Sequence, residues 1–297
     1  MAYDFKIRSA VQANGKTAFF AKITGIDEPE FFVGFRTKYQ ERFGLYNSTA
    51  PSTLVYRGSD YDAEFGFWAY FIEPTTKVES NASFICLNTY DRAFFTFGFM
   101  QFAAHVPNGD FVKFLKKLLT LPNAEKYFPR LALIDDRIFY KSDQGTLTQL
   151  ENDDSSKKLM EYLNPTTDEI ENQELICSAR FVHWAINDPA QRRIQVEHSI
   201  SLYKENMKKY HKRFNLNGYP AKICFMICDI LHQGRGTYDR IAYALDTDNL
   251  EKAFQNLCTI GNVHYQSRID ALKVQIKKLE QTGIFNKTYD AATNVFV

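Results

Sequence analysis

Alternating apolar and polar residues near the N-terminus predict a β-hairpin. The alternation runs through Phe5–Arg8 and again through Phe19–Ile23, and side chains along a strand point to opposite faces with a period of two. Between the two runs lies Asn14-Gly15, a dipeptide that favours the backbone of a tight hairpin turn. We therefore expect the first fifty residues to form an N-terminal β element, with residues 51–297 as the main domain.

Helical spacing follows this β element. Phe65, Trp68 and Ile72 recur at intervals of three and four residues, which places them on one face of a helix. The apolar stripe stops at Glu73-Pro74. Because a residue before proline avoids the α conformation, this helix is expected to end at or just before Glu73.

The rest of the chain changes from strands to helices. An aromatic-rich run at residues 93–102 and the apolar segment before it predict short strands that fold back on each other. After Asp110 the spacing is helical, and helices are expected to dominate from about residue 157 to 282. The polar segment 142–167 is the candidate linker between two lobes. The order of elements predicts an α+β fold, mainly α, with a β-hairpin beside a cleft.

Composition indicates a globular chain without a broad charged face. Its 297 residues are 45% hydrophobic and carry 36 Lys and Arg against 35 Asp and Glu, so charge gives no reason to expect nucleic acid or a membrane as partner. The basic run at 208–213 is more typical of a solvated helix face. The sequence has no apolar run of signal-peptide or membrane-spanning length, so we expect synthesis in the cytoplasm.

The cysteines indicate reduced thiols. Five of them are scattered along the chain, which suits a reducing compartment better than a disulfide framework. Cys224 and Cys228 are spaced to share one helix face, where two small buried side chains are expected rather than a metal site. The sequence implies neither a metal nor a cofactor.

Two carboxyl groups have the surroundings that acid–base chemistry needs. Cleavage of a glycosidic bond usually requires one protonated carboxyl group and one ionised one. Glu73 lies between an aromatic helix and an apolar hairpin, where partial burial would retain its proton. Asp91 lies among polar residues such as Asn88 and Thr89, which favours the ionised form. We therefore expect Glu73 to act as general acid and Asp91 as general base.

Each residue also has an ordinary structural interpretation. Taken alone, Glu73 could be a solvated helix-end residue, and Glu64 or Glu79 would be equal candidates for the proton donor. Asp91 could close a turn through its own side chain, and Thr96 could serve β propensity alone.

The spacing of Glu73, Asp91 and Thr96 resembles that of glycoside hydrolase family 46, the chitosanase type within the lysozyme superfamily. In that pattern a helix ends in the acid Glu, the catalytic Asp follows eighteen residues later, and a Thr five residues beyond positions the attacking water. This chain shows both spacings. Its segment 91–99 is similar to the family's Asp-Gly-Arg-Gly-Tyr-Thr-Ala-Gly-Ile, although Arg92 replaces the glycine.

Later segments extend the resemblance to about residue 275. Gly109-Asp110 resembles a sugar-binding Gly-Asp, and residues 188–195, 228–234 and 267–272 resemble three further segments of the family. We expect ion pairs of Asp188, Arg192 and Arg268 behind the site, where they could orient Asp91. The expected substrate contacts are Asp110, Arg92, Gln101 and His105. His105 has an equally good interpretation as an ordinary surface histidine.

These features favour peptidoglycan as the substrate. Gly98-Phe-Met-Gln101 is similar to the Gly-Leu-Met-Gln of goose-type lysozymes and lytic transglycosylases, and the chain lacks the acidic excess that suits polycationic chitosan. The resemblance implies a lysozyme-like two-lobed fold and an inverting glycoside hydrolase. We expect a muramidase that acts outside the cell or in the periplasm after non-classical delivery. It would be a secreted antibacterial effector or a phage lysin, and its expected partner is an immunity protein or a secretion-apparatus carrier. A chitosanase is the alternative, and a non-catalytic glycan-binding or structural module is the second.

Overall fold

The predicted N-terminal hairpin is confirmed, and it begins a larger antiparallel sheet. In the computed structural model, which describes residues 2–297, strand β1 (Phe5–Val11) pairs with β2 (Thr17–Ile23). Their connection contains Asn14, whose side chain accepts a backbone N–H, and Gly15 at a φ of 76°. The Asn-Gly dipeptide thus supplies the left-handed backbone that the turn requires.

The same sheet continues in chain order from β1 to β7. The five strands after the hairpin are β3 (Phe31–Tyr39), β4 (Arg42–Asn47), β5 (Leu87–Asn88), β6 (Thr96–Phe97) and β7 (Phe102–Ala103). The short strands β5, β6 and β7 confirm that the aromatic-rich run folds back on itself. One sheet therefore joins the first fifty residues to the strands that carry Thr96 and flank Asp91.

The chain divides into two compact units. The first contains the residues up to Val55 together with Ser83–Gln195, and the second contains Tyr56–Ala82 and Val196–Val297. The expectation that residues 142–167 link two lobes is wrong, because this segment lies wholly inside the first unit. Helix α7 (Pro189–Phe214) has residues in both units.

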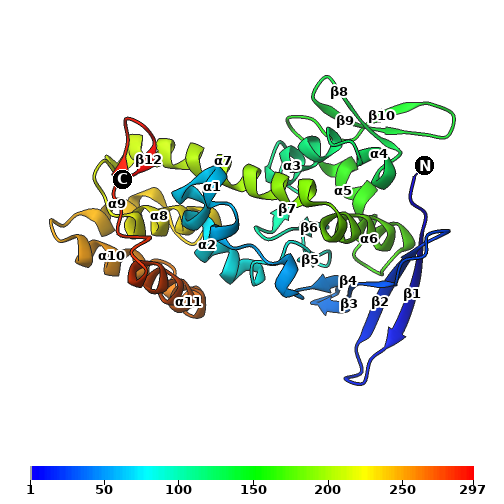
Figure 1. Cartoon of the computed structure of the whole chain (residues 1–297), viewed down its shortest axis with the longest axis horizontal. Coiled ribbons are helices and arrows are strands. Elements are labelled where there is room, and N and C mark those ends of the chain that lie inside the picture. The colour runs from blue at the N-terminus through cyan, green and yellow to red at the C-terminus, as the bar shows by residue number, and fades with distance from the viewer. Residues whose placement is uncertain (1) are drawn as a thin grey trace. The chain divides into compact units, whose positions relative to one another are not determined.

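Helices and a second sheet complete the first unit (Figure 1). These elements are η1 (Ser52–Leu54), α3 (Asp110–Leu119), α4 (Ala124–Tyr127), β8 (Leu131–Ile134), β9 (Arg137–Lys141), β10 (Leu147–Gln149), α5 (Lys157–Leu163) and α6 (Asn172–Asn187). Helix α6 packs against β1 and β3, and α3 packs against β7 and β8. Helix α3 confirms the helical spacing after Asp110, whereas the sheet β8–β10 was not predicted.

Phenylalanine side chains form much of the core of the first unit. Phe95, Phe97 and Phe99 have no exposed surface. The rings of Phe95 and Phe97 lie 5.3 and 5.1 Å from that of Phe181 on α6, measured between centroids. Burial of each such ring stabilises the fold by roughly 1.5–3 kcal/mol. The stripe is therefore core, as predicted, rather than a platform for sugars.

The second unit is mostly helical, as predicted for the C-terminal part of the chain. Besides most of α7, it contains η2 (Gly58–Asp60), α1 (Asp62–Phe65), α2 (Phe67–Ser80), α8 (Ala221–Gln233), α9 (Tyr238–Leu245), α10 (Leu250–Thr259), α11 (Asn262–Gln281), β11 (Tyr289–Asp290) and β12 (Val295–Phe296). Helix α2 contacts α8, α11 and β12. Within residues 2–297, no helix combines the length and apolar character needed to cross a membrane.

Helix α2 does not end at Glu73, so that prediction is wrong. The helix continues through Pro74 to Ser80 and stops where Asn81 adopts a left-handed conformation with a φ of 54°. An interior proline removes one helical hydrogen bond and costs roughly 3 kcal/mol. Contacts of α2 with α8, α11 and β12 bury its apolar residues, among them Phe71, Ile72 and Pro74 itself, and this burial opposes the cost.

We expect Gly98→Ala to destabilise the protein more than Gly25→Ala. Both glycines have a positive φ, 89° and 75°, but a Cβ at Gly98 would collide with the side chain of Gln195, whereas nothing lies within 4 Å of a Cβ at Gly25. The control substitution should cost about 1–2 kcal/mol for the left-handed backbone alone, and Gly98→Ala should cost roughly 1–3 kcal/mol more. Urea denaturation of both variants measures the difference. Equal losses would show that the close packing of Gln195 is unimportant.

Candidate functional site

The predicted catalytic residues belong to separate units. Asp91 and Thr96 lie in the first unit, together with all four predicted substrate contacts. Glu73 lies in the second unit, as does Arg268. The proposed acid and base are thus supported by different sets of packed elements.

Asp91 is held in a tight loop between β5 and β6. Its Oδ1 accepts the backbone N–H of Ala93 at 2.8 Å, and its Oδ2 accepts a hydrogen bond from Asn88 Nδ2 at 2.9 Å. The first of these bonds is the turn contact expected of an aspartate in a loop. Asn88 also lies directly opposite Thr96 in the pairing of β5 with β6, so one asparagine adjoins both residues.

Arg92 and His105 share the surroundings of Asp91. Arg92 is exposed, whereas His105 is half-buried. Burial lowers the pKa of His105, the positive charge of Arg92 lowers it further, and the negative charge of Asp91 acts in the opposite direction. These effects link the three side chains in one polar cluster and favour a neutral imidazole at neutral pH.

The two other predicted substrate contacts have evident structural roles. Gln101 has a φ of 55°, and its Nε2 donates to the Gly98 carbonyl at 2.9 Å, which closes the turn between β6 and β7. Asp110 is the first residue of α3, where a carboxylate interacts favourably with the helix dipole. Contact of either residue with a substrate stays a prediction.

Asp188 and Arg192 lie at the junction of α6 and α7 but do not form an ion pair with each other. Asp188 Oδ2 accepts hydrogen bonds from Asn123 Nδ2 and Trp184 Nε1, both at 3.0 Å. Arg192 donates from Nη1 to two carbonyl groups at the end of α6, the nearer at 2.6 Å. The carbonyls at a helix end lack helical partners and are strong acceptors, so they bind the guanidinium, whose charge still helps to lower the pKa of Asp188.

Two buried residues that the sequence did not single out anchor the Asp91 loop. Asn164 donates from Nδ2 to the carbonyl oxygens of Thr89 and Phe94, at 2.9 and 3.0 Å. Glu174 accepts a hydrogen bond from the Thr89 hydroxyl through Oε1. Both ends of the loop are therefore fixed from α5 and α6. The available signal was the position of Glu174, which lies three and seven residues before the apolar Cys177 and Phe181 of α6.

Glu174 is an unusual group because no cation neutralises it. Its side chain is fully buried, and its Oε2 has no hydrogen-bond partner among the described residues. Burial raises its pKa to about 8, although the hydrogen bond from Thr89 acts in the opposite direction. At neutral pH the buried carboxyl group is therefore mainly protonated.

Glu73 lies in the middle of α2 and binds one backbone group. Its Oε2 accepts the Gly58 N–H at 3.0 Å. A Cβ at Gly58 would lie 2.9 Å from the same oxygen and 2.6 Å from Tyr70 Cδ1. Only glycine therefore allows this backbone to approach the half-buried carboxyl group so closely.

The end of α2 carries a different glutamate, Glu79. Its Oε1 lies 2.8 Å from Nη1 of Arg268, and its side chain is 17% exposed. Arg268 also lies 2.6 Å from Oδ1 of Asp229, which has no exposed surface and has a second ion pair with Arg235 at 3.3 Å. Arg268 thus forms ion pairs, but its partners are Glu79 and Asp229. The two guanidinium groups compensate the buried Asp229 carboxylate.

The described residues offer no evident metal site. Within residues 2–297, no group of three or more His, Cys, Asp and Glu is placed to hold a metal ion. Cys224 and Cys228 are buried free thiols on α8, as predicted.

Comparisons with protein-family models, with curated proteins and with solved structures found no match.

We expect Glu174→Gln to stabilise the protein at pH 8 but not at pH 5. The unfolded chain releases this proton near pH 4.5, whereas the folded protein keeps it up to about pH 8. The contribution of protonated Glu174 to the free energy of unfolding is therefore fully present below pH 4.5 and is lost as the pH rises towards 8. Because one pKa unit corresponds to about 1.4 kcal/mol, the variant should gain roughly 2–5 kcal/mol at pH 8. Urea denaturation at both pH values measures this gain.

Glu169→Gln is the matched control, because Glu169 is exposed. It should leave the stability at both pH values almost unchanged. A parent protein with equal stability at pH 5 and pH 8, and no gain in Glu174→Gln, would mean that Glu174 is ionised in the fold.

Proposed function

We propose that this chain is a glycoside hydrolase with a lysozyme-like fold that cleaves β-1,4-linked amino-sugar polymers by an inverting mechanism. The observation that carries the proposal is the arrangement around Asp91. Its carboxyl group accepts two N–H groups, which leaves lone pairs for a water proton. Thr96, a buried residue of β6, lies opposite Asn88, which donates to Asp91, and we assign it the role of orienting the water.

In the proposed reaction a glutamate of α2 protonates the glycosidic oxygen as the bond to the anomeric carbon breaks. A water molecule attacks that carbon from the opposite face, and Asp91 accepts its proton. An inverting mechanism of this kind places the acid and the base on opposite faces of the sugar ring.

Two glutamates of α2 compete for the role of proton donor. Glu73 has the predicted spacing to Asp91, and its observed partner is the Gly58 N–H. Glu79 instead occupies the helix end that the resemblance associates with the acid, and it binds Arg268. We retain Glu73 as the first assignment and keep Glu79, already a candidate from the sequence, as the alternative that its position at the end of α2 supports.

The charge beside Asp91 favours peptidoglycan over chitosan. Arg92 is exposed in the same cluster as Asp91 and His105. A guanidinium attracts the lactyl and peptide carboxylates of peptidoglycan and repels the amines of chitosan. A muramidase acting as an antibacterial effector or phage lysin, with an immunity protein or carrier as partner, belongs to this proposal. Chitosanase activity and a non-catalytic glycan-binding module are the alternatives.

We expect the purified protein to release muropeptides with reducing MurNAc ends from peptidoglycan sacculi, as measured by mass spectrometry. Loss of a general acid or base typically costs 10²–10⁴-fold in rate, so Glu73→Gln and Asp91→Asn should each slow release by about that factor. Glu169→Gln, an exposed control, should keep full activity. A large loss in Glu79→Gln with a mild effect of Glu73→Gln would transfer the acid role to Glu79.

Parallel incubation with chitosan distinguishes the alternatives. Glucosamine oligomers in place of muropeptides would identify a chitosanase. No product from either polymer, combined with co-sedimentation of the protein with sacculi, would identify a binding module and overturn the enzymatic proposal.

A further inference from the structure

A second candidate site lies in the first unit, apart from the predicted catalytic residues. It is a cavity of about 650 Å³ lined by side chains of β9, β10, α5 and α6 and by Arg130, just before β8. Three cationic side chains line it, those of Arg130, Lys158 and Arg180, but only one carboxylate, that of Glu161. The lining is therefore positively charged.

Arg180 has a deficit of hydrogen-bond acceptors. Its Nε is buried and has no hydrogen-bond partner among residues 2–297. Its charge and a hydrogen bond with Tyr162 both act to lower the pKa of that phenol, so Tyr162 is the polar neighbour of this guanidinium. The group lies over the ring of Phe128, 5.6 Å from the centroid, which stabilises the cation without accepting its hydrogen bonds. An anion in the cavity would accept hydrogen bonds from the other N–H groups of the guanidinium.

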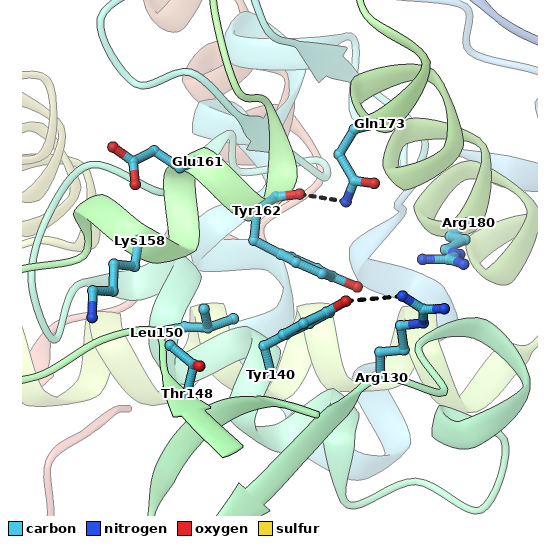
Figure 2. Close-up of a pocket in the computed structure, with 9 residues that line it drawn as sticks. All are labelled: Arg130, Tyr140, Thr148, Leu150, Lys158, Glu161, Tyr162, Gln173 and Arg180. Atoms are coloured by element: carbon cyan, nitrogen blue, oxygen red, sulfur yellow. Dashed lines mark hydrogen bonds between the residues drawn. The ribbon is translucent and has the colours of Figure 1, made fainter. Parts of the chain in front are cut away.

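Arg130 lies at the same end of the cavity, and its present partners can be replaced. It donates to the Tyr140 hydroxyl at 2.9 Å and to Asp143 at 2.6 Å. Asp143 is 81% exposed, and exposed ion pairs of this kind contribute little stability. Figure 2 shows that the phenol oxygens of Tyr140 and Tyr162 point towards the guanidinium groups of Arg130 and Arg180.

The two tyrosine rings, which lie between the arginines and Lys158 (Figure 2), suit an organic body. The rings of Tyr140 and Tyr162 lie 5.8 Å apart at an angle of 51°, and both tyrosines are half-buried. Their ring faces can contact an aromatic or sugar ring. Lys158 and Glu161 extend from α5 on the side away from the two arginines (Figure 2).

We propose that this cavity binds an organic oxyanion, a carboxylate or a phosphate ester. The anionic group lies between Arg130 and Arg180, where the two phenol hydroxyls supply further hydrogen bonds, and the body of the ligand lies against Tyr140 and Tyr162. Paired guanidinium groups bind carboxylate and phosphate alike, so the two sources are separated by experiment. The site does not depend on the proposed glycosidase activity.

Isothermal titration calorimetry of the full chain with phenyl phosphate and with benzoate tests the proposal. At least one probe should bind with a Kd in the micromolar to low millimolar range, and the tighter of the two identifies the anionic group. Phenol, which has the ring without the charge, should bind at least about tenfold more weakly, because it lacks the anionic group to which the two guanidinium groups donate.

Variants then locate the site. Arg130→Gln and Arg180→Gln should each weaken binding about tenfold or more, while Arg213→Gln, which removes an exposed arginine of the second unit, should change nothing. Because Arg130 is 49% exposed, its variant keeps the test informative if Arg180→Gln fails to fold. Absence of saturable binding by both probes, binding of phenol as tight as that of the anions, or unchanged affinity in Arg130→Gln would each overturn the proposal.

Discussion

The first unit is organised around a carboxyl group that the fold keeps away from water and from positive charge. Glu174 reaches from α6 to the Thr89 hydroxyl, and that same hydroxyl accepts the Leu45 N–H of β4 at 2.6 Å. Asn164, at the end of α5, holds the backbone on both sides of Asp91. Two helices and the sheet therefore meet at one threonine, and the position of the Asp91 loop depends on this contact. Ionisation of Glu174 would bring an uncompensated charge to this point.

The second unit buries a carboxyl group by a different physical route. Asp229 keeps its charge compensated because Arg235 and Arg268 both lie within ion-pair distance. A buried ion pair stabilises a fold only weakly in net terms, but loss of one partner is expensive because it leaves the other charge unpaired. The fold thus uses protonation to accommodate one buried acid and paired cations to accommodate the other.

In both units, the buried acid supports a more accessible one. Glu174 and Asn164 fix the loop of Asp91, whereas Asp229 fixes the guanidinium that binds Glu79. Such supporting contacts restrict the orientation of a reactive side chain, and their loss commonly reduces activity without any contact with substrate. The cavity between Arg130 and Arg180 has the opposite imbalance, since its cations outnumber its carboxylates.

Local patterns in the sequence determined the elements whose signals lie within a few residues of one another. The Asn14-Gly15 turn, helix α3 and the burial of the phenylalanine run all follow from short-range periodicity and backbone preference. Tertiary packing decided the rest. Helix α2 passes Pro74 because its apolar face packs against α8, α11 and β12. Glu174 shares a helix stripe with apolar residues, and its hydrogen bond to Thr89 follows only from the pairing of β4 with β5. Such contacts join residues about 85 positions apart, and no local pattern encodes them, because their free energy arises only when distant segments pack together.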